Sequence, residues 1–197
     1  MENSYRYIDP DFKYTNKNGV LYNLANIENE DVLAVFESLK VSKRLEELYE
    51  NPIQIIDSES LIYIHRYLFQ DVYEWAGKTR TVNISKDGKP FFEGERFETG
   101  FKYVNSLITD FKNIEINDKR KIARTLAEIL DNVNFLHPFR EGNGRTQREF
   151  LRLLALEKGF TLNLNPPDNK EIFERYMNGT INSDVEVLSH LIFEIIN

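Results

Sequence analysis

The chain has 197 residues, a formal net charge of −7 and a hydrophobic fraction of 41%. These values predict a soluble globular protein of one domain that can bury a core. The acidic balance argues against a general nucleic-acid binder, because neutralising phosphates requires a surplus of Lys and Arg. The absence of cysteine excludes disulfides, thiolate nucleophiles and cysteine-based zinc sites.

The beginning of the sequence has no apolar stretch of the kind that marks a secretory signal. No apolar run reaches the length of a membrane span. We therefore expect a cytoplasmic protein that contacts neither a membrane nor nucleic acid directly.

Periodicity predicts a mainly α protein with one short β-hairpin. Residues 1–27 read as irregular. Apolar positions at helical spacing predict helices over residues 29–49, 58–75, 97–111, 118–136, 146–158, 169–177 and 184–196. Pro138 should end the fourth of these helices, and Gly159 should cap the fifth. Between the second and third helices, an alternating stretch, turn residues and an aromatic pair predict a hairpin over 81–92. We expect a single domain over 1–197 with its core at about 55–160.

The segment HPFREGNGRTQR, residues 137–148, lies between two strongly helical stretches. It places a titratable base, His137, at the end of one helix and a carboxylate, Glu141, four residues later. Gly142, Asn143 and Gly144 then lead into the next helix. Glycines let the backbone turn sharply and approach a ligand closely. A helix N-terminus binds anions through its unpaired N–H groups and its positive dipole end.

Two arginines strengthen the case for an anion site. Arg145 and Arg148 are three residues apart, on one side of the predicted helix, and guanidinium groups suit phosphate oxygens. A single carboxylate beside such a site favours Mg²⁺, which takes oxygen ligands and usually shares substrate phosphates. The residues therefore predict a nucleotide polyphosphate site with a histidine at its edge. The P-loop and Rossmann glycine patterns are both missing.

The same twelve residues resemble the signature of the Fic family, HxFx[DE]GNGRxxR, and meet every specified position. Residues 64–80 are similar to the helix that precedes the family's flap, and the hairpin at 81–92 falls where that flap belongs. Residues 14–23 are similar to the lead-in of the stand-alone toxin and secreted-effector branch. The resemblance implies a Fic fold and a bacterial protein, cytoplasmic or delivered into a host cell.

The resemblance also implies an activity, the transfer of AMP from ATP to a Tyr, Thr or Ser hydroxyl of a target protein. His137 would be the general base, with pyrophosphate as the leaving group. Phe139 would be buried and hold the loop, and Glu141 would bind Mg²⁺.

In the same resemblance, the backbone of Gly142, Asn143 and Gly144 would cradle the phosphates. Arg145 would contact the β-phosphate and Arg148 the γ-phosphate. The flap, including Ser85 and Lys86, would align the target by strand-like pairing, which is a backbone mode of recognition.

Many Fic enzymes are inhibited by a helix with the pattern [ST]xxxE[GN], whose glutamate pairs with the second arginine of the signature. This chain has no complete match. We therefore expect the inhibitory helix on a separate small antitoxin-like protein, with Glu194 as a less favoured internal candidate. In the absence of ATP, we expect some carboxylate to compete for Arg148.

Two other functions remain open at this stage. A Fic-fold enzyme could transfer UMP, phosphocholine or phosphate, although kinase-like relatives alter the glycine-rich part, which is intact here. A non-enzymatic interaction module could keep the motif and lack target docking.

His65, in an apolar helical stretch, is interpreted as a core or boundary residue.

Overall fold

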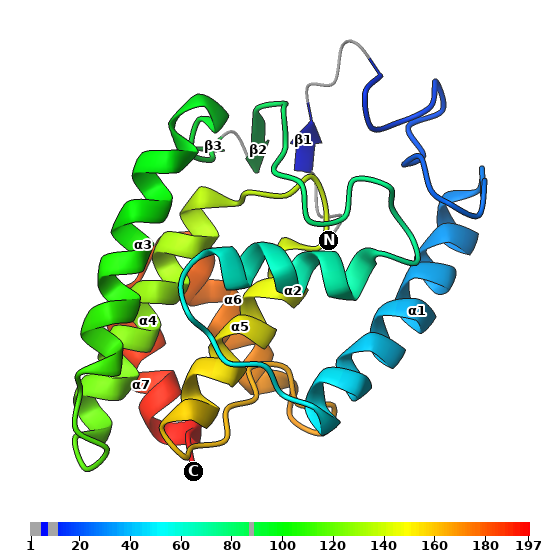
Figure 1. The fold of residues 1–197 in the computed structure, drawn as a ribbon. Helices are drawn as coiled ribbons and strands as arrows, with labels where there is room; N and C mark the ends of the chain where they lie inside the picture. The colour runs from blue at the N-terminus through cyan, green and yellow to red at the C-terminus, as the bar shows by residue number, and fades with distance from the viewer. Residues whose placement is uncertain (1–4, 8–11, 87–88) are drawn as a thin grey trace.

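The computed structural model describes residues 5–7, 12–86 and 89–197 (Figure 1). This part of the chain is mainly helical, as predicted. Its helices are α1 (Glu30–Glu50), α2 (Glu59–Phe69), α3 (Phe97–Lys112), α4 (Lys119–Leu136), α5 (Asn143–Glu157), α6 (Lys170–Asn182) and α7 (Val185–Ile195), with a 3₁₀ turn at Gly94–Arg96. None of the described helices combines the length and apolarity that crossing a membrane requires.

The core is built around α4, which packs against α3, α5, α6 and α7. The apolar face predicted for this helix is fully buried, at Leu126, Ile129, Leu130 and Val133. Asp118 caps its first turn by accepting a hydrogen bond from the Lys121 N–H. The signature begins at the other end of α4, so it follows directly from a helix that is packed in the core.

Helix α2 is shorter than the sequence predicted. It ends at Phe69 rather than near residue 75, because the Phe69 carbonyl accepts hydrogen bonds from the N–H groups of both Val72 and Tyr73. The chain turns there and brings Tyr73 and Trp75 into a stack with ring centroids 4.3 Å apart. Smaller differences are that α5 begins three residues earlier than predicted and that α6 continues to Asn182.

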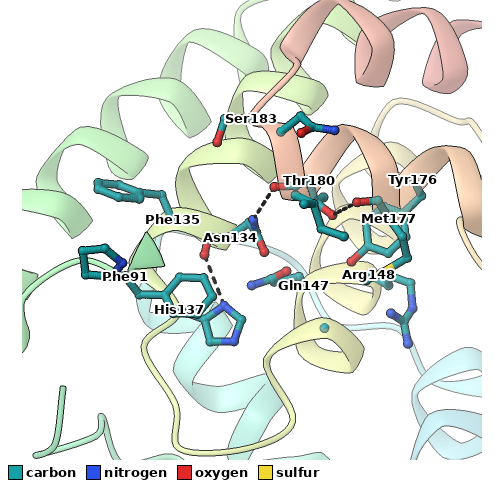
Figure 2. Close-up of a pocket in the computed structure, with 14 residues that line it drawn as sticks. Phe91, Asn134, Phe135, His137, Gln147, Arg148, Tyr176, Met177, Thr180 and Ser183 are labelled. Carbon is teal, nitrogen blue, oxygen red and sulfur yellow. Dashed lines mark hydrogen bonds between the residues drawn. The ribbon is translucent and has the colours of Figure 1, made fainter. Parts of the chain in front are cut away.

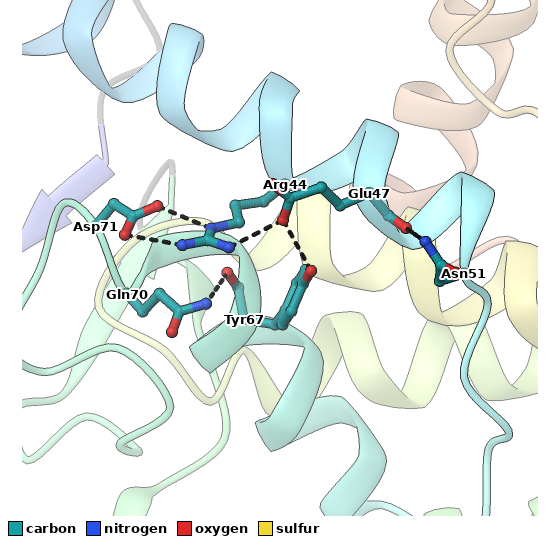
Figure 3. Close-up of polar contacts among 6 residues, drawn as sticks. All are labelled: Arg44, Glu47, Asn51, Tyr67, Gln70 and Asp71. Atoms are coloured by element: carbon teal, nitrogen blue, oxygen red, sulfur yellow. Dashed lines mark hydrogen bonds and ion pairs between the residues drawn. The ribbon is translucent and has the colours of Figure 1, made fainter.

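Helix α1 is held to α2 by a polar network, shown in Figure 3. Arg44 donates two hydrogen bonds to Asp71, at 2.8 and 3.0 Å, and one of 2.9 Å to Glu47. The Tyr67 hydroxyl donates to the same Glu47 carboxylate at 2.8 Å. Bidentate Arg–carboxylate geometry fixes direction as well as distance, so the network fixes α1 relative to α2.

The hairpin is present as β2 (Ile84–Lys86) and β3 (Lys89–Pro90), and its turn at 87–88 lies outside the described residues. A further strand, β1 (Tyr5–Tyr7), pairs antiparallel with β2, so β2 is the middle strand of the order β1-β2-β3. The prediction of irregular structure over 1–27 is therefore wrong at residues 5–7. Three residues are too few for periodicity to reveal a strand.

Candidate active site

The C-terminal end of α4 places His137. Its N–H donates to the Val133 carbonyl at 3.1 Å, and its backbone then adopts a left-handed conformation, with φ 43°. This conformation is rare for a residue with a side chain and turns the chain out of the helix. Pro138 follows at once and cannot continue the helix, as predicted.

The His137 ring is fixed on both sides. Its Nδ1 lies 3.2 Å from the Asn134 carbonyl (Figure 2), and its face stacks on Phe91 with centroids 3.9 Å apart. A carbonyl oxygen can only accept, so Nδ1 carries the proton. In the neutral ring, Nε2 is then the basic nitrogen. The residue is buried, with 6% of its surface exposed.

The side chain of Asn143 stabilises the loop after His137 with two hydrogen bonds to the loop backbone. Its side-chain oxygen accepts from the Phe139 N–H at 2.9 Å, and its side-chain nitrogen donates to the Phe139 carbonyl at 2.8 Å. Gly142 has φ 80°, and a Cβ there would lie 2.2 Å from the Phe69 ring. The glycine is therefore required by both backbone conformation and space.

A second histidine, His65 of α2, contacts this loop from the core. His65 is fully buried and stacks on Phe139, with ring centroids 3.8 Å apart. Its Nδ1 accepts from the Gly77 N–H at 2.8 Å, so Nε2 carries the proton and donates to the Glu141 carbonyl at 3.0 Å. Burial lowers the pKa of His65 to about 3, so the ring stays neutral at physiological pH. The interpretation of His65 as a core or boundary residue is confirmed, but its contact with the loop was not predicted.

The Glu141 carboxylate lies where the loop meets α5. It accepts a hydrogen bond of 2.8 Å from the Gly142 N–H, and one oxygen is 3.6 Å from the Arg145 guanidinium. Desolvation raises the pKa of Glu141 above its usual value, and the nearby Glu37 charge adds a smaller effect in the same direction. Within the described residues, no three acidic or histidine side chains cluster as a metal cage would need. A cation here would take one carboxylate from the protein, which suits Mg²⁺ shared with a nucleotide.

The two signature arginines have different neighbours. Arg145 donates to Glu37 of α1 at 2.5 Å and lies over the Phe69 ring at 4.8 Å, and the Tyr73 hydroxyl donates to the same carboxylate. Arg148 instead lies over the rings of Phe173 and Tyr176, 5.7 Å from each centroid.

None of the ion pairs among the described residues involves Arg148, and the carboxylate contacts that the structure shows are on Arg145 instead. The described residues of this chain therefore do not supply the carboxylate that was expected beside Arg148. Glu37 lies 108 positions away from Arg145.

A cavity of about 290 Å³ opens beside the loop and brings together His137, Gly144 and Arg148. In Figure 2, Gln147 lies between His137 and Arg148. The remaining walls come from the hairpin, α4 and α6: Pro90, Phe91, Asn134, Phe135, Tyr176, Met177, Thr180, Ile181, Asn182 and Ser183. The cavity is thus lined by aromatic rings and amide groups, together with the imidazole of His137 and the guanidinium of Arg148.

The other predicted residues are not among those that line this cavity. Asn143 is buried in the first turn of α5, and Ser85 and Lys86 are on β2. Glu194 is outside the lining, where it pairs with Arg175 of α6 at 2.7 Å. It does not reach Arg148 in this arrangement.

Two residues that the sequence analysis did not single out, Glu37 and Arg80, contact signature residues directly. Arg80 donates to the His137 carbonyl. A charged residue on a helix or before a hairpin is usually solvated, so neither has a local signal. Both are recognised only once the fold brings distant segments together.

The fold and the loop define a class: a helical protein in which a histidine, a glycine-rich turn and a helix N-terminus share one cavity. The Fic/DOC family model matches residues 55–155. The protein adenylyltransferase VbhT of Bartonella schoenbuchensis is 35% identical over 167 residues, covering 84% of this chain and 34% of VbhT. Probable protein adenylyltransferase y4lH of Sinorhizobium fredii is 34% identical over 159 residues, covering 79% of this chain and 80% of y4lH.

A solved structure shares the fold over most of the chain. The N-terminal Fic domain of a VirB-translocated Bep effector protein from Bartonella quintana, with bound ADP, superposes with a TM-score of 0.80 at 26% identity. The match covers 93% of this chain and 94% of that domain. The chain therefore belongs to the Fic/DOC family. It spans only about a third of VbhT, while it spans most of y4lH.

Proposed function

We propose that the chain is a protein adenylyltransferase that moves AMP from ATP to a Tyr, Thr or Ser hydroxyl of a target protein. The observation that carries the proposal is the position of His137. Its Nδ1–H is anchored on the Asn134 carbonyl, and its ring lines the same cavity as Gly144 and Arg148. A base and a phosphate-binding group on one cavity wall are what nucleotidyl transfer requires. The names of the relatives agree with this activity.

In the proposed reaction, the target hydroxyl oxygen attacks the α-phosphorus of ATP in line with the leaving group. A new O–P bond forms, the bond from the α-phosphorus to the bridging oxygen breaks, and pyrophosphate leaves with that electron pair. The hydroxyl proton goes to Nε2 of His137. A base of this kind contributes about 10²- to 10⁴-fold to a rate. Orientation and charge stabilisation would supply most of the rest.

The phosphates would lie at the N-terminus of α5, cradled by Gly142, Asn143 and Gly144. Arg145 would contact the β-phosphate and Arg148 the γ-phosphate. Glu141 would hold Mg²⁺, which would neutralise charge on the phosphate oxygens. For Arg145 to reach a phosphate, the anion must compete with Glu37, whose carboxylate now accepts from this arginine.

The target segment would pair with the hairpin, near Ser85 and Lys86. Because β2 already pairs with β3 on one side and with β1 on the other, a target strand on β2 would have to replace β1. Removal of residues 1–11 should therefore raise the rate of transfer to a target. A lower rate would show that the target does not use that edge.

Control would come from a separate small antitoxin-like protein whose helix brings a carboxylate to Arg148. The aromatic rather than acidic surroundings of Arg148 support an external source. The isolated chain should then be active without mutation, and such a partner should suppress it.

Peptide mass spectrometry tests the transferred group. The protein is incubated with a lysate, Mg²⁺ and equal concentrations of ATP, UTP and CDP-choline. We expect a hydroxyl-containing peptide that carries AMP. A peptide that carries UMP, phosphocholine or phosphate would replace AMP transfer by one of the alternatives. Absence of any adduct would favour a non-enzymatic interaction module.

A further inference from the structure

Arg80 is a buried cation with an unusual set of partners. It precedes the hairpin, and only 3% of its surface is exposed. Its guanidinium donates hydrogen bonds to four backbone carbonyl oxygens. Burial lowers the pKa of Arg80 to about 10, so the group is still charged at neutral pH. Its position over the Phe97 ring, 4.9 Å from the centroid, adds a cation–π contact.

Part of this set lies at the end of α4. Arg80 Nε donates to the His137 carbonyl at 2.8 Å, Nη2 to the Leu136 carbonyl at 3.4 Å, and the Arg80 backbone N–H to the Pro138 carbonyl at 2.8 Å. The last carbonyls of a helix have no partner within the helix. Both Leu136 and His137 are buried, so water is a poor substitute. A cation also interacts favourably with this end of the helix dipole.

The other part lies at the base of the hairpin. Nη1 donates to the Val82 carbonyl at 2.8 Å, just before β2, and Nη2 donates to the Phe92 carbonyl at 2.5 Å, just after β3. The Phe92 N–H in turn donates to the Phe135 carbonyl of α4 at 3.0 Å. One side chain thus holds both ends of the hairpin and the backbone of His137.

We propose that Arg80 is a positioning residue for AMP transfer, which fixes the hairpin relative to His137 and so sets the distance from a docked hydroxyl to the imidazole. The proposal rests on the proposed function. Arg80 is not part of the cavity lining, so it acts through His137 and the hairpin and does not contact the nucleotide. The planar fork matters because its three nitrogens together reach four carbonyl oxygens, whereas a lysine ammonium has three N–H donors on a single nitrogen.

The test compares Arg80→Lys with Arg152→Lys in the whole protein. Arg152 serves as the control, because it is an arginine that is partly buried and, like Arg80, donates to a backbone carbonyl, that of Leu48, but it lies on α5 away from the hairpin. For each protein, the transfer rate, the ATP dissociation constant and amide hydrogen exchange are measured.

We expect Arg80→Lys to lower the transfer rate at saturating ATP about 10- to 100-fold, since a misplacement of about 1 Å can cost about 10²-fold. The ATP dissociation constant should stay within about twofold. Exchange should accelerate at the Phe91 and Phe92 amides and not at those of α7. Arg152→Lys should leave the rate and the hairpin exchange unchanged.

Two results would overturn the proposal. One is an unchanged rate in Arg80→Lys. The other is a loss of rate accompanied by faster exchange throughout the chain, which would make Arg80 only a stabiliser of the fold. If Arg80→Lys does not fold, Arg80→Gln, which keeps one donor nitrogen, is measured in the same way. Hydrogen exchange needs no substrate, so an inactive wild type would contradict the proposed function while leaving the hairpin measurement decisive for Arg80.

Discussion

His65 and His137 are both buried, and both touch the signature loop, yet they hold their protons on opposite nitrogens. His65 accepts at Nδ1 from Gly77 and donates from Nε2 to the Glu141 carbonyl. His137 donates from Nδ1 to the Asn134 carbonyl, which makes Nε2 its basic nitrogen. The first ring is sealed in the core, and the second lines the cavity.

The comparison shows that environment, and not residue type, assigns the role. Both ring nitrogens of His65 are used by the backbone, so it can stabilise the loop and cannot exchange protons with a substrate. In His137, one nitrogen fixes the orientation of the ring, and the other is the basic one. Three predictions break or sharpen this difference, and a fourth concerns Glu194, which lies away from both histidines.

The largest effect should come from His137→Ala. We expect the transfer rate to fall by about 10²- to 10⁴-fold, because the proposed general base is removed. ATP affinity and the melting temperature should remain close to wild type, since the imidazole would act on the hydroxyl and not on the phosphates. Initial rates, calorimetric titration with ATP and thermal unfolding measure the three quantities. A variant with the wild-type rate would remove His137 from the mechanism.

His65→Phe should act mainly on stability. The phenyl ring can keep the stack on Phe139, but the Gly77 N–H and the Glu141 carbonyl lose their partner. We expect the free energy of unfolding to fall by about 2 kcal/mol, which urea unfolding can measure. A change below about 0.5 kcal/mol would mean that the two hydrogen bonds do not hold the loop.

The free energy of unfolding should depend on pH differently in the wild type and in His65→Phe. The pKa of His65 is about 3 in the folded protein and about 6.5 in the unfolded chain, so the unfolded state binds the extra proton first. The stability that His65 contributes is present above pH 6.5 and is lost progressively as the pH falls toward 3.

Between pH 6.5 and pH 5, we expect the wild type to lose about 2 kcal/mol more than His65→Phe. Acidic residues with lowered pKa values, such as Asp71 and Glu47, contribute equally to both proteins and cancel. Parallel stability curves for the two proteins would contradict the neutral, buried state of His65.

The smallest effect should come from Glu194→Gly. Glu194 pairs with Arg175 on the surface, with 53% of its side chain exposed, and does not approach the cavity. We expect the transfer rate to stay within about twofold, since exposed ion pairs contribute little. A many-fold rise in the isolated chain would locate inhibition inside this protein and remove the need for a separate partner.

Much of the fold was predictable from local pattern. The amphipathic face of α4, its end at Pro138 and the left-handed Gly159 after α5 are confirmed, because they depend on neighbours a few residues apart. The fold class and the family are confirmed as well. The early end of α2 was missed, because it depends on a turn stabilised by tertiary contacts of Asp71 and Tyr73.

Only the part of the candidate site that is continuous in sequence was predictable. The signature placed His137, Glu141 and the glycines in one segment, and the structure brings that segment to a cavity. The roles of these residues in transfer remain predictions. The partners that hold the segment, Glu37, His65 and Arg80, come from sequence positions far from it. No period or spacing in the sequence connects them to the loop.

We propose above that the protein transfers the nucleotidyl group of ATP. Parallel reactions with ATP labelled at the α-phosphate or at the γ-phosphate test this activity most directly. The wild type is incubated with target lysate and Mg²⁺, and protein-bound label is measured after denaturing electrophoresis. We predict that α-label becomes bound to protein and that γ-label leaves as pyrophosphate. Protein labelled from the γ-phosphate would show a kinase reaction and would contradict the claim.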